Sequence, residues 1–187
     1  MAPHDPREIF IRGESIVLRA LRRQDAEDGP WFGWFNDETL CKTLQKHYFP
    51  NTPEAQVSFW ERHVNGASDR IQLGICRPDD RTLIGVVSLS AIDYINRKAE
   101  LSIVLGEPGA HNVKTFVEAC RLMMRHGFDT LNLNRIYGGS MSREVVQMLC
   151  RTLRCRAEGV ARQDIYKDGS YRDAYLYGVL REEFTAT

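Results

Sequence analysis

Alternation of apolar and polar residues predicts most of the strands in this chain. Residues 15–21 alternate and begin with β-branched side chains, which is typical of a half-buried strand. Runs rich in Val, Ile and Leu, bounded by turn residues, predict the other strands at 71–77, 82–93, 99–105, 135–139, 156–166 and 171–180. The sequence Lys167–Asp–Gly–Ser170 separates the last two and predicts a hairpin turn.

Apolar residues spaced three and four apart, together with helix start signals, predict helices at 22–34, 39–44, 52–64, 113–127 and 142–153. Thr52 followed by Pro53 and Glu54 is a typical start, because the hydroxyl caps, proline fits the first turn and the acid faces the positive dipole end. Ser142 is the expected N-cap of the last helix.

The order of these elements, with the short helix at 39–44 left out, is β-α-α-β-β-β-α-β-α-β-β, which indicates an α/β fold. We expect a mixed, mostly antiparallel central sheet with helices on both faces. The length of 187 residues predicts one domain over residues 1–187, in which residues 1–12 are a flexible N-terminal extension.

Composition and charge narrow the class of protein. The 25 basic and 25 acidic side chains cancel, which argues against a nucleic-acid partner because such binding needs a basic face. The apolar runs are too short to span a membrane, and the N-terminus lacks the apolar core of a signal peptide. Five scattered cysteines without a C-x-x-C pair fit reduced thiols, so we expect a cytoplasmic protein without a metal site. The sequence leaves a homodimer open.

The segment 99–133 combines a strand, a turn and a long helix. The strand part, Leu101–Leu105, stops at Gly106–Glu–Pro–Gly109, and the helical pattern follows at once. The N–H groups at a helix start are free and the dipole adds positive potential there, so this arrangement suits a phosphate or another anion.

Three blocks of sequence carry a resemblance to a known family. The first is GESIVLRAL at 13–21. The second is LIGVVSL at 83–89, followed by NRKAELSIVLG at 96–106. The third runs from Glu158–Gly159 through KDGSYRD at 167–173 to LYGVLRE at 176–182. Their order and spacing over residues 13–183 resemble the GNAT superfamily of acyl-coenzyme-A-dependent N-acyltransferases. The nearest branch includes ribosomal-protein N-terminal and nucleotide-aminosugar N-acetyltransferases. The resemblance implies acetyl-CoA as co-substrate and a small-molecule amine as acceptor.

The chain departs from the family pattern at positions that contact the cofactor. Residues 111–114, HNVK, stand where the family's loop has glycines, which let backbone amides approach a pyrophosphate closely. Arg143 stands in place of a cofactor-binding Asn, and Cys150 in place of a Tyr that acts as an acid. These departures keep open an alternative in which the fold has lost catalysis and serves as a binding module.

The resemblance places the cofactor along the strand of segment 99–133 and at the helix start. The backbone of Ile103, Val104 and Leu105 is expected to pair with the pantetheine amides, and one amide to polarise the thioester carbonyl. An ordinary buried strand is the alternative. The residues expected near the phosphates are His111, Asn112, Val113, Lys114, Thr115 and Arg143. Lys114 either replaces by charge what the glycines supply by geometry or is a solvated lysine.

Glu100 and Cys150 are the candidate catalytic residues implied by the resemblance. Acetylation requires that the amine lose a proton and that the departing thiolate gain one. Glu100 is expected as the base, with a salt bridge to Arg97 or Lys98 as the alternative. Cys150, with an unperturbed pKa of about 8.5, is expected to protonate the thiolate, or else is a small core residue.

An acceptor site is expected where aromatic and polar residues gather. The candidate binding residues are Trp34, His47, Tyr48, Asp93 and Tyr94, since rings stack on the flat faces of sugars and bases. The segments 47–50 and 92–97 look more like the aminosugar branch, so a nucleotide-linked aminosugar is the first choice. The N-terminal amine of a protein or another small amine is the alternative.

Overall fold

The computed structural model describes residues 8–42, 44 and 48–185. Its elements are β1 (Ile9–Arg12), β2 (Val17–Ala20), α1 (Arg23–Glu27), α2 (Trp31–Trp34), α3 (Glu38–Cys41), α4 (Pro53–His63), β3 (Ile71–Cys76), β4 (Leu83–Asp93), β5 (Lys98–Leu105), the 3₁₀ turn η2 (Pro108–Ala110), α5 (Val113–Arg125), the π-helical turn η3 (His126–Thr130), β6 (Arg135–Ser140), α6 (Arg143–Leu153), β7 (Arg156–Lys167), β8 (Ser170–Leu180) and α7 (Arg181–Thr185).

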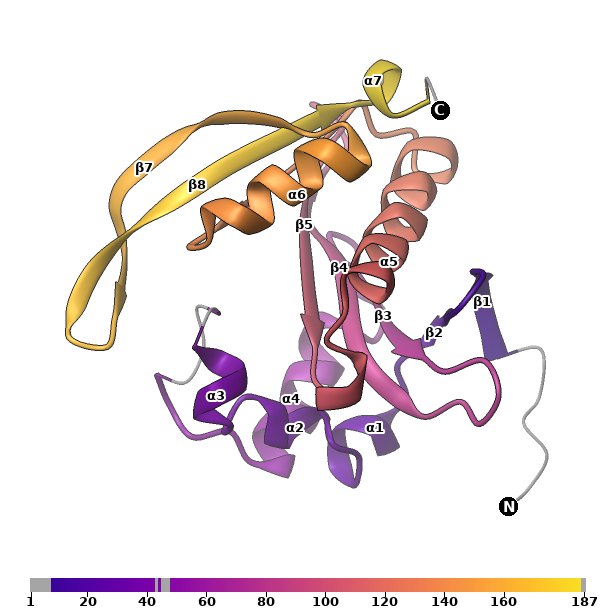
Figure 1. Cartoon of the computed structure of the whole chain (residues 1–187). Helices are drawn as coiled ribbons and strands as arrows, with labels where there is room; N and C mark the ends of the chain where they lie inside the picture. The colour runs from indigo at the N-terminus through magenta and orange to yellow at the C-terminus, as the bar shows by residue number, and fades with distance from the viewer. Residues whose placement is uncertain (1–7, 43, 45–47, 186–187) are drawn as a thin grey trace.

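The strands form one eight-stranded sheet in the order β1-β2-β3-β4-β5-β6-β8-β7. Only β5 and β6 are parallel, and the other neighbours are antiparallel. Helices α1 to α4 gather on one side of the sheet, and α5 and α6 lie on the other (Figure 1). The predicted mixed, mostly antiparallel sheet with helices on both faces is confirmed.

The parallel pair β5–β6 separates partway along its length. Pairing covers Lys98 to Glu100 against Arg135 to Tyr137. Beyond that point β5 pairs only with β4, and β6 only with β8 (Figure 1). The backbone groups of Leu101–Leu105 on the β6 side are therefore without a strand partner, as at a sheet edge.

Each face of the sheet carries its own apolar core. Alternate residues of β4 and β5, among them Leu89 and Leu101, pack against α5 and α6. On the other face Trp31, Trp34 and Val86 pack with α1 and α4. Because helices cover both faces of the sheet, β4 is buried along almost its whole length. Its sequence is therefore a nearly continuous apolar run.

The structure corrects three expectations about elements. Residues 9–12, expected within a flexible extension, form β1 because alternate apolar residues let them pair with β2. The helix predicted over 22–34 is two helices, because Gly29 and Pro30 interrupt it and Pro30 becomes the N-cap of α2. The long helix continues past Gly127 as a π-helical turn to Thr130.

Candidate active site

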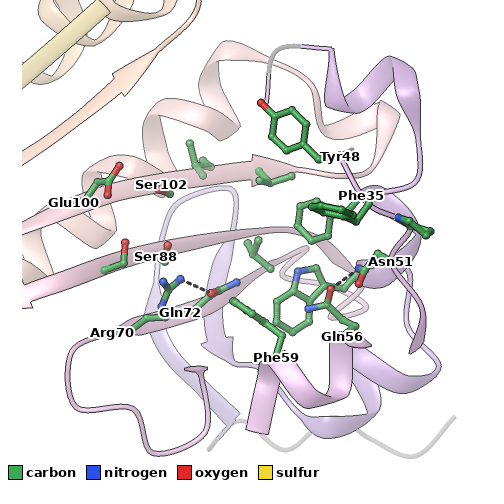
Figure 2. A pocket seen from close by; sticks show the side chains of 17 residues that line it. Phe35, Tyr48, Asn51, Gln56, Phe59, Arg70, Gln72, Ser88, Glu100 and Ser102 are labelled. Atoms are coloured by element: carbon green, nitrogen blue, oxygen red, sulfur yellow. Dashed lines mark hydrogen bonds between the residues drawn. The ribbon is translucent and has the colours of Figure 1, made fainter. Parts of the chain in front are cut away.

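A cavity of about 560 Å³, named here the strand-face cavity, lies over β3, β4 and β5 on the side of α2 and α4. Figure 2 shows its aromatic wall, with Phe35 and Phe59 on the helix side and Tyr48 at the rim. Aromatic walls with a few polar groups are typical of small-molecule sites.

Strand register builds a polar floor for the strand-face cavity. Gln72 of β3 lies opposite Ser88 of β4, and Ser88 lies opposite Ser102 of β5. Two residues further along β4, Ser90 pairs with Glu100 of β5. Because successive side chains point to opposite faces of a sheet, these residues share the cavity face while their neighbours enter the opposite core (Figure 2).

Glu100 presents a half-buried carboxylate to this floor. It makes no ion pair or hydrogen bond with any residue that the structure describes. The alternative partner Arg97 donates instead to the backbone carbonyl and the side-chain oxygen of Asn132. No ion pair to Lys98 is found within the described chain either. An unpaired carboxylate in a cavity is free to accept a proton from a ligand.

A second cavity of about 510 Å³, named here the loop cavity, lies between α3, the loop that follows β5, and α6. Its lining includes Phe116 of α5 and both Val145 and Met148 of α6. Ile103 and Val104 of β5 line this cavity and the strand-face cavity alike. A ligand laid along the unpaired edge of β5 would thus reach from one cavity to the other.

The start of α5 retains part of an anion-binding helix terminus. The side chain of Asn112 is the N-cap, and its Oδ1 accepts the backbone N–H of Thr115 at 2.9 Å. The N–H groups of Val113 and Lys114 have no acceptor among the described residues, and the Lys114 side chain is exposed. Two free N–H groups, the dipole and one ammonium remain available to a phosphate.

His111 lies in the loop before α5, but its ring turns back to the end of β5. Nε2 lies 2.7 Å from the backbone oxygen of Leu105. The Leu105 carbonyl, expected to pair with the cofactor, therefore already has a partner in the protein.

Trp34 is a core residue, contrary to its predicted place in the acceptor site. Its side chain is 6% exposed, and a Cβ placed on Gly106 would lie 1.9 Å from its Cδ2. Gly106 therefore permits close packing of an indole against the loop. Trp31 and Phe35, which are four residues apart and share a face, line the strand-face cavity instead.

The structure does not bring Cys150 or Arg143 to the loop cavity or the strand-face cavity. Both line a separate cavity of about 540 Å³ between α6 and the β7–β8 hairpin, together with Tyr175. They are seven residues apart, on the face of α6 that looks away from Val145 and Met148. Their position gives no support to the expected roles of Cys150 as the acid and Arg143 as a phosphate ligand.

Asp93 and Tyr94 belong to a structural turn rather than to the acceptor site. The Asp93 carboxylate accepts the backbone N–H groups of Ile95 and Asn96 and the Asn96 side-chain amide. The Asn96 side-chain hydrogen bond, followed by the backbone ones, lowers the pKa of Asp93. The Tyr94 hydroxyl donates to the carbonyl of Ser68 at 2.8 Å. Neither residue lines either cavity.

Tyr48 lines the strand-face cavity as expected, and it also ties the cavity to the hairpin. Its hydroxyl donates to the backbone oxygen of Tyr166 in β7 at 2.9 Å, and the Lys167 ammonium lies 5.5 Å from its ring centroid. His47, the other expected residue of this segment, lies outside the described residues.

Sequence reasoning missed several residues of the floor and wall. They are Asn51, Gln56, Phe59, Arg70, Gln72, Ser88 and Ser90. A signal was present in β4, where serines at alternate positions interrupt an apolar strand. Arg70 and Gln72 had no comparable signal, because only the register of β3 places them beside β4.

Within the described ranges, no helix combines the length and apolarity needed to cross a bilayer. In the same part of the chain, no group of three or more His, Cys, Asp or Glu side chains is placed to hold a metal ion.

Comparison with known proteins decides the family. A family model described as an acetyltransferase (GNAT) domain matches residues 15–144. The chain belongs to the GNAT acetyltransferase family. This GNAT chain is 28% identical over 186 residues to YdaF of Bacillus subtilis (strain 168), named provisionally as a ribosomal N-acetyltransferase, with 91% of the chain and 94% of YdaF covered. It is 24% identical over 176 residues to the spermidine N(1)-acetyltransferase of Escherichia coli (strain K12), with 92% and 89% covered.

A solved structure shares the fold of the GNAT chain. It is a spermidine N-acetyltransferase from Vibrio cholerae in complex with CoA and spermine, with a TM-score of 0.82. The match covers 91% of this chain and 98% of that one at 20% sequence identity, so it establishes the fold alone. Acetyl-CoA as co-substrate fits the family, the separated strands and the free helix start described above.

Proposed function

We propose that this GNAT chain transfers an acetyl group from acetyl-CoA to a primary amine on a small molecule. The observation that carries the proposal is the unpaired edge of β5 at Leu101–Leu105, where the strand-face and loop cavities meet. Pantetheine amides would pair with this edge, and the pyrophosphate would lie at the α5 start beside Lys114. The acetyl group would then lie near Ile103 and Val104, facing the strand-face cavity.

Glu100 is the proposed base. The acceptor enters as an ammonium ion, loses one proton to the Glu100 carboxylate directly or through a water, and attacks the thioester carbonyl carbon with its lone pair. The carbon–sulfur bond breaks and its electron pair leaves on sulfur. A second N–H proton then passes from the attacking nitrogen to the sulfur, which yields an amide and a free thiol. This balance needs no separate side-chain acid, in keeping with the distant position of Cys150.

The acceptor is best described as a small primary amine. The two named relatives point to a ribosomal substrate and to spermidine, so neither supports the nucleotide-linked aminosugar favoured by the sequence. A polyamine also fits this cavity poorly. Glu100 is the one carboxylate among its described lining residues, and the cation Arg70 lines it too. A protein N-terminus stays the alternative enzyme substrate.

A binding module without catalysis is the second candidate. The observation in its favour is that the Leu105 carbonyl and the Thr115 N–H are both engaged by protein side chains, those of His111 and Asn112.

Calorimetry with acetyl-CoA, followed by a thiol-release assay on a panel of amines, separates these functions. We expect a dissociation constant below about 1 mM and release of free thiol with at least one small amine. Tight binding without release for any amine would favour the binding module. Absence of acetyl-CoA binding would overturn the proposed transferase.

A further inference from the structure

Arg70 presents a cation without a carboxylate partner to the strand-face cavity. Its guanidinium contacts the Gln72 Oε1 at 3.5 Å and lies 5.7 Å from the centroid of the Phe59 ring. It forms no ion pair with any described residue, and Figure 2 shows it beside Gln72 at the β3 side of the floor. A half-buried guanidinium held by an aromatic face and an amide is oriented to bind an anion in a two-pronged manner.

Two further donors line the same cavity without an acceptor. Trp31 is fully buried, and its Nε1–H has no hydrogen-bond partner among the described residues. Gln56 is 3% exposed; its oxygen accepts from Asn51, while its amide nitrogen donates to no described residue. The Phe59 and Trp31 rings pack edge-on, with their centroids 6.0 Å apart. Because Arg70 lies over the same Phe59 ring, the indole and the guanidinium are both next to Phe59. The buried Trp31 N–H without an acceptor is costly, and the Gln56 amide nitrogen is a further donor for a ligand rich in acceptor oxygens.

Resting on the proposed transferase function, we propose that the acceptor is a primary amine that also carries an anionic group, a carboxylate or a phosphate, which Arg70 binds. The amine of this acceptor lies toward Glu100. The positions of the two charges follow from the sheet, because Glu100 is on β5, Arg70 directly precedes β3, and β4 runs between them. Neighbouring strands are about 4.8 Å apart, so the two backbones are about 10 Å apart. The cavity thus carries one charge of each sign on opposite sides of its floor, complementary to a zwitterionic acceptor.

The test measures binding without turnover, with the CoA thiol present in place of acetyl-CoA. Calorimetry compares two matched pairs of probes, glucosamine 6-phosphate against glucosamine and 4-aminobutyrate against butylamine. We expect at least one amine with an anionic group to bind about tenfold or more tightly than its partner without that group, and spermidine to bind no better than butylamine. The pair that shows the preference tells a phosphate-bearing acceptor from a carboxylate-bearing one.

Arg70→Gln should abolish this preference, and Arg70→Lys should restore part of it because the charge returns without the planar fork. Arg62→Gln, on the exposed surface of α4, is the control and should leave the preference intact. CoA affinity should be unchanged in all three variants, which shows that each is folded.

The inference would be overturned by equal binding within both pairs or by an unchanged preference in Arg70→Gln. It would also be overturned if both anionic amines failed to bind at millimolar concentration, or if spermidine bound more tightly than butylamine. Failure of the transferase itself is distinguishable. In that case the anionic amine binds through Arg70 but releases no thiol from acetyl-CoA.

Discussion

Gly106 shows at the scale of a single residue how surroundings decide a role. In the sequence it reads as part of a glycine-containing turn before a helix, the kind that approaches an anion. In the structure its missing Cβ makes room for the indole of Trp34. Gly109, three residues later in the same loop, has open space where a Cβ would lie. The two glycines therefore provide a matched pair of sites.

Gly106→Ala is expected to lower the free energy of unfolding by about 2–3 kcal/mol, because the new methyl group and the Trp34 indole cannot occupy the same space. Gly109→Ala should change it by no more than about 0.5 kcal/mol. Urea unfolding followed by tryptophan fluorescence measures both. Equal losses in the two variants would contradict the packing role of Gly106.

Glu100→Gln is expected to lower kcat about 100-fold or more with an active amine, since the amide cannot accept the proton. Affinity for acetyl-CoA should be unchanged. Ser102→Ala, which alters the neighbouring floor residue on β5, is the comparison and should reduce kcat only a few-fold. Steady-state thiol release gives kcat and KM for each variant. A loss in Glu100→Gln no larger than that in Ser102→Ala would rule out the base.

At the scale of elements, the junction between β5 and α5 determines how an anion can be held. Asn112 gives α5 an ordinary side-chain cap, which stabilises the helix and occupies the Thr115 N–H. The remaining N–H groups of Val113 and Lys114 face outward, with the Lys114 side chain exposed beside them. We therefore propose that charge at this terminus takes over part of the work that the resemblance assigns to glycine backbone.

Lys114→Ala is expected to weaken acetyl-CoA binding several-fold, because it removes an ammonium from the proposed phosphate position. Arg125→Ala removes a positive charge from the other end of α5 and should leave the affinity unchanged. Calorimetry at two salt concentrations measures both, and the Lys114 effect should shrink at high salt. An equal effect of the two substitutions would show that only net charge matters.

At the scale of the whole molecule, the sheet separates between β5 and β6. The β7–β8 hairpin, beyond this separation, contacts Tyr48 in the N-terminal half of the chain. The β7–β8 hairpin extends beyond the core, and its end meets Tyr48 at the rim of the strand-face cavity (Figure 1). The acceptor side of the proposed site is therefore bounded by segments more than one hundred residues apart in sequence.

Tyr48→Phe should raise the acceptor KM about two- to five-fold, because it removes the hydroxyl that ties the hairpin to the cavity rim and leaves the ring in place. Tyr94→Phe removes an equivalent hydroxyl-to-carbonyl bond, to Ser68, away from both cavities. It should leave KM unchanged. Steady-state kinetics tests both variants, and identical KM values would show that the hairpin contact does not shape the acceptor site.

Local signals in the sequence were enough to predict most elements. Thr52 and Ser142 cap their helices as expected, with their hydroxyls accepting from Ala55 and Val145. The hairpin turn forms with Asp168 and Gly169 at positive φ. These features depend on residues within one turn of each other, so the chain encodes them without reference to the fold. The break at Gly29–Pro30 was equally local, although helical spacing outweighed it in the prediction.

The sequence by itself determined most of the elements and the helix caps, because these depend on short-range pattern, and the family, through the order and spacing of its three blocks. Only the tertiary structure decided which side chains share a cavity. Which face of α6 carries Cys150, which strand lies beside Ser88, and where β5 leaves β6 all depend on the register and rotation of elements packed from distant parts of the chain. A shift of one residue in a strand, or a 100° rotation per residue in a helix, moves a side chain from a cavity to a core. Glu100 was expected through the family resemblance, whereas Arg70 lines the cavity only because β3 lies beside β4 in the folded sheet.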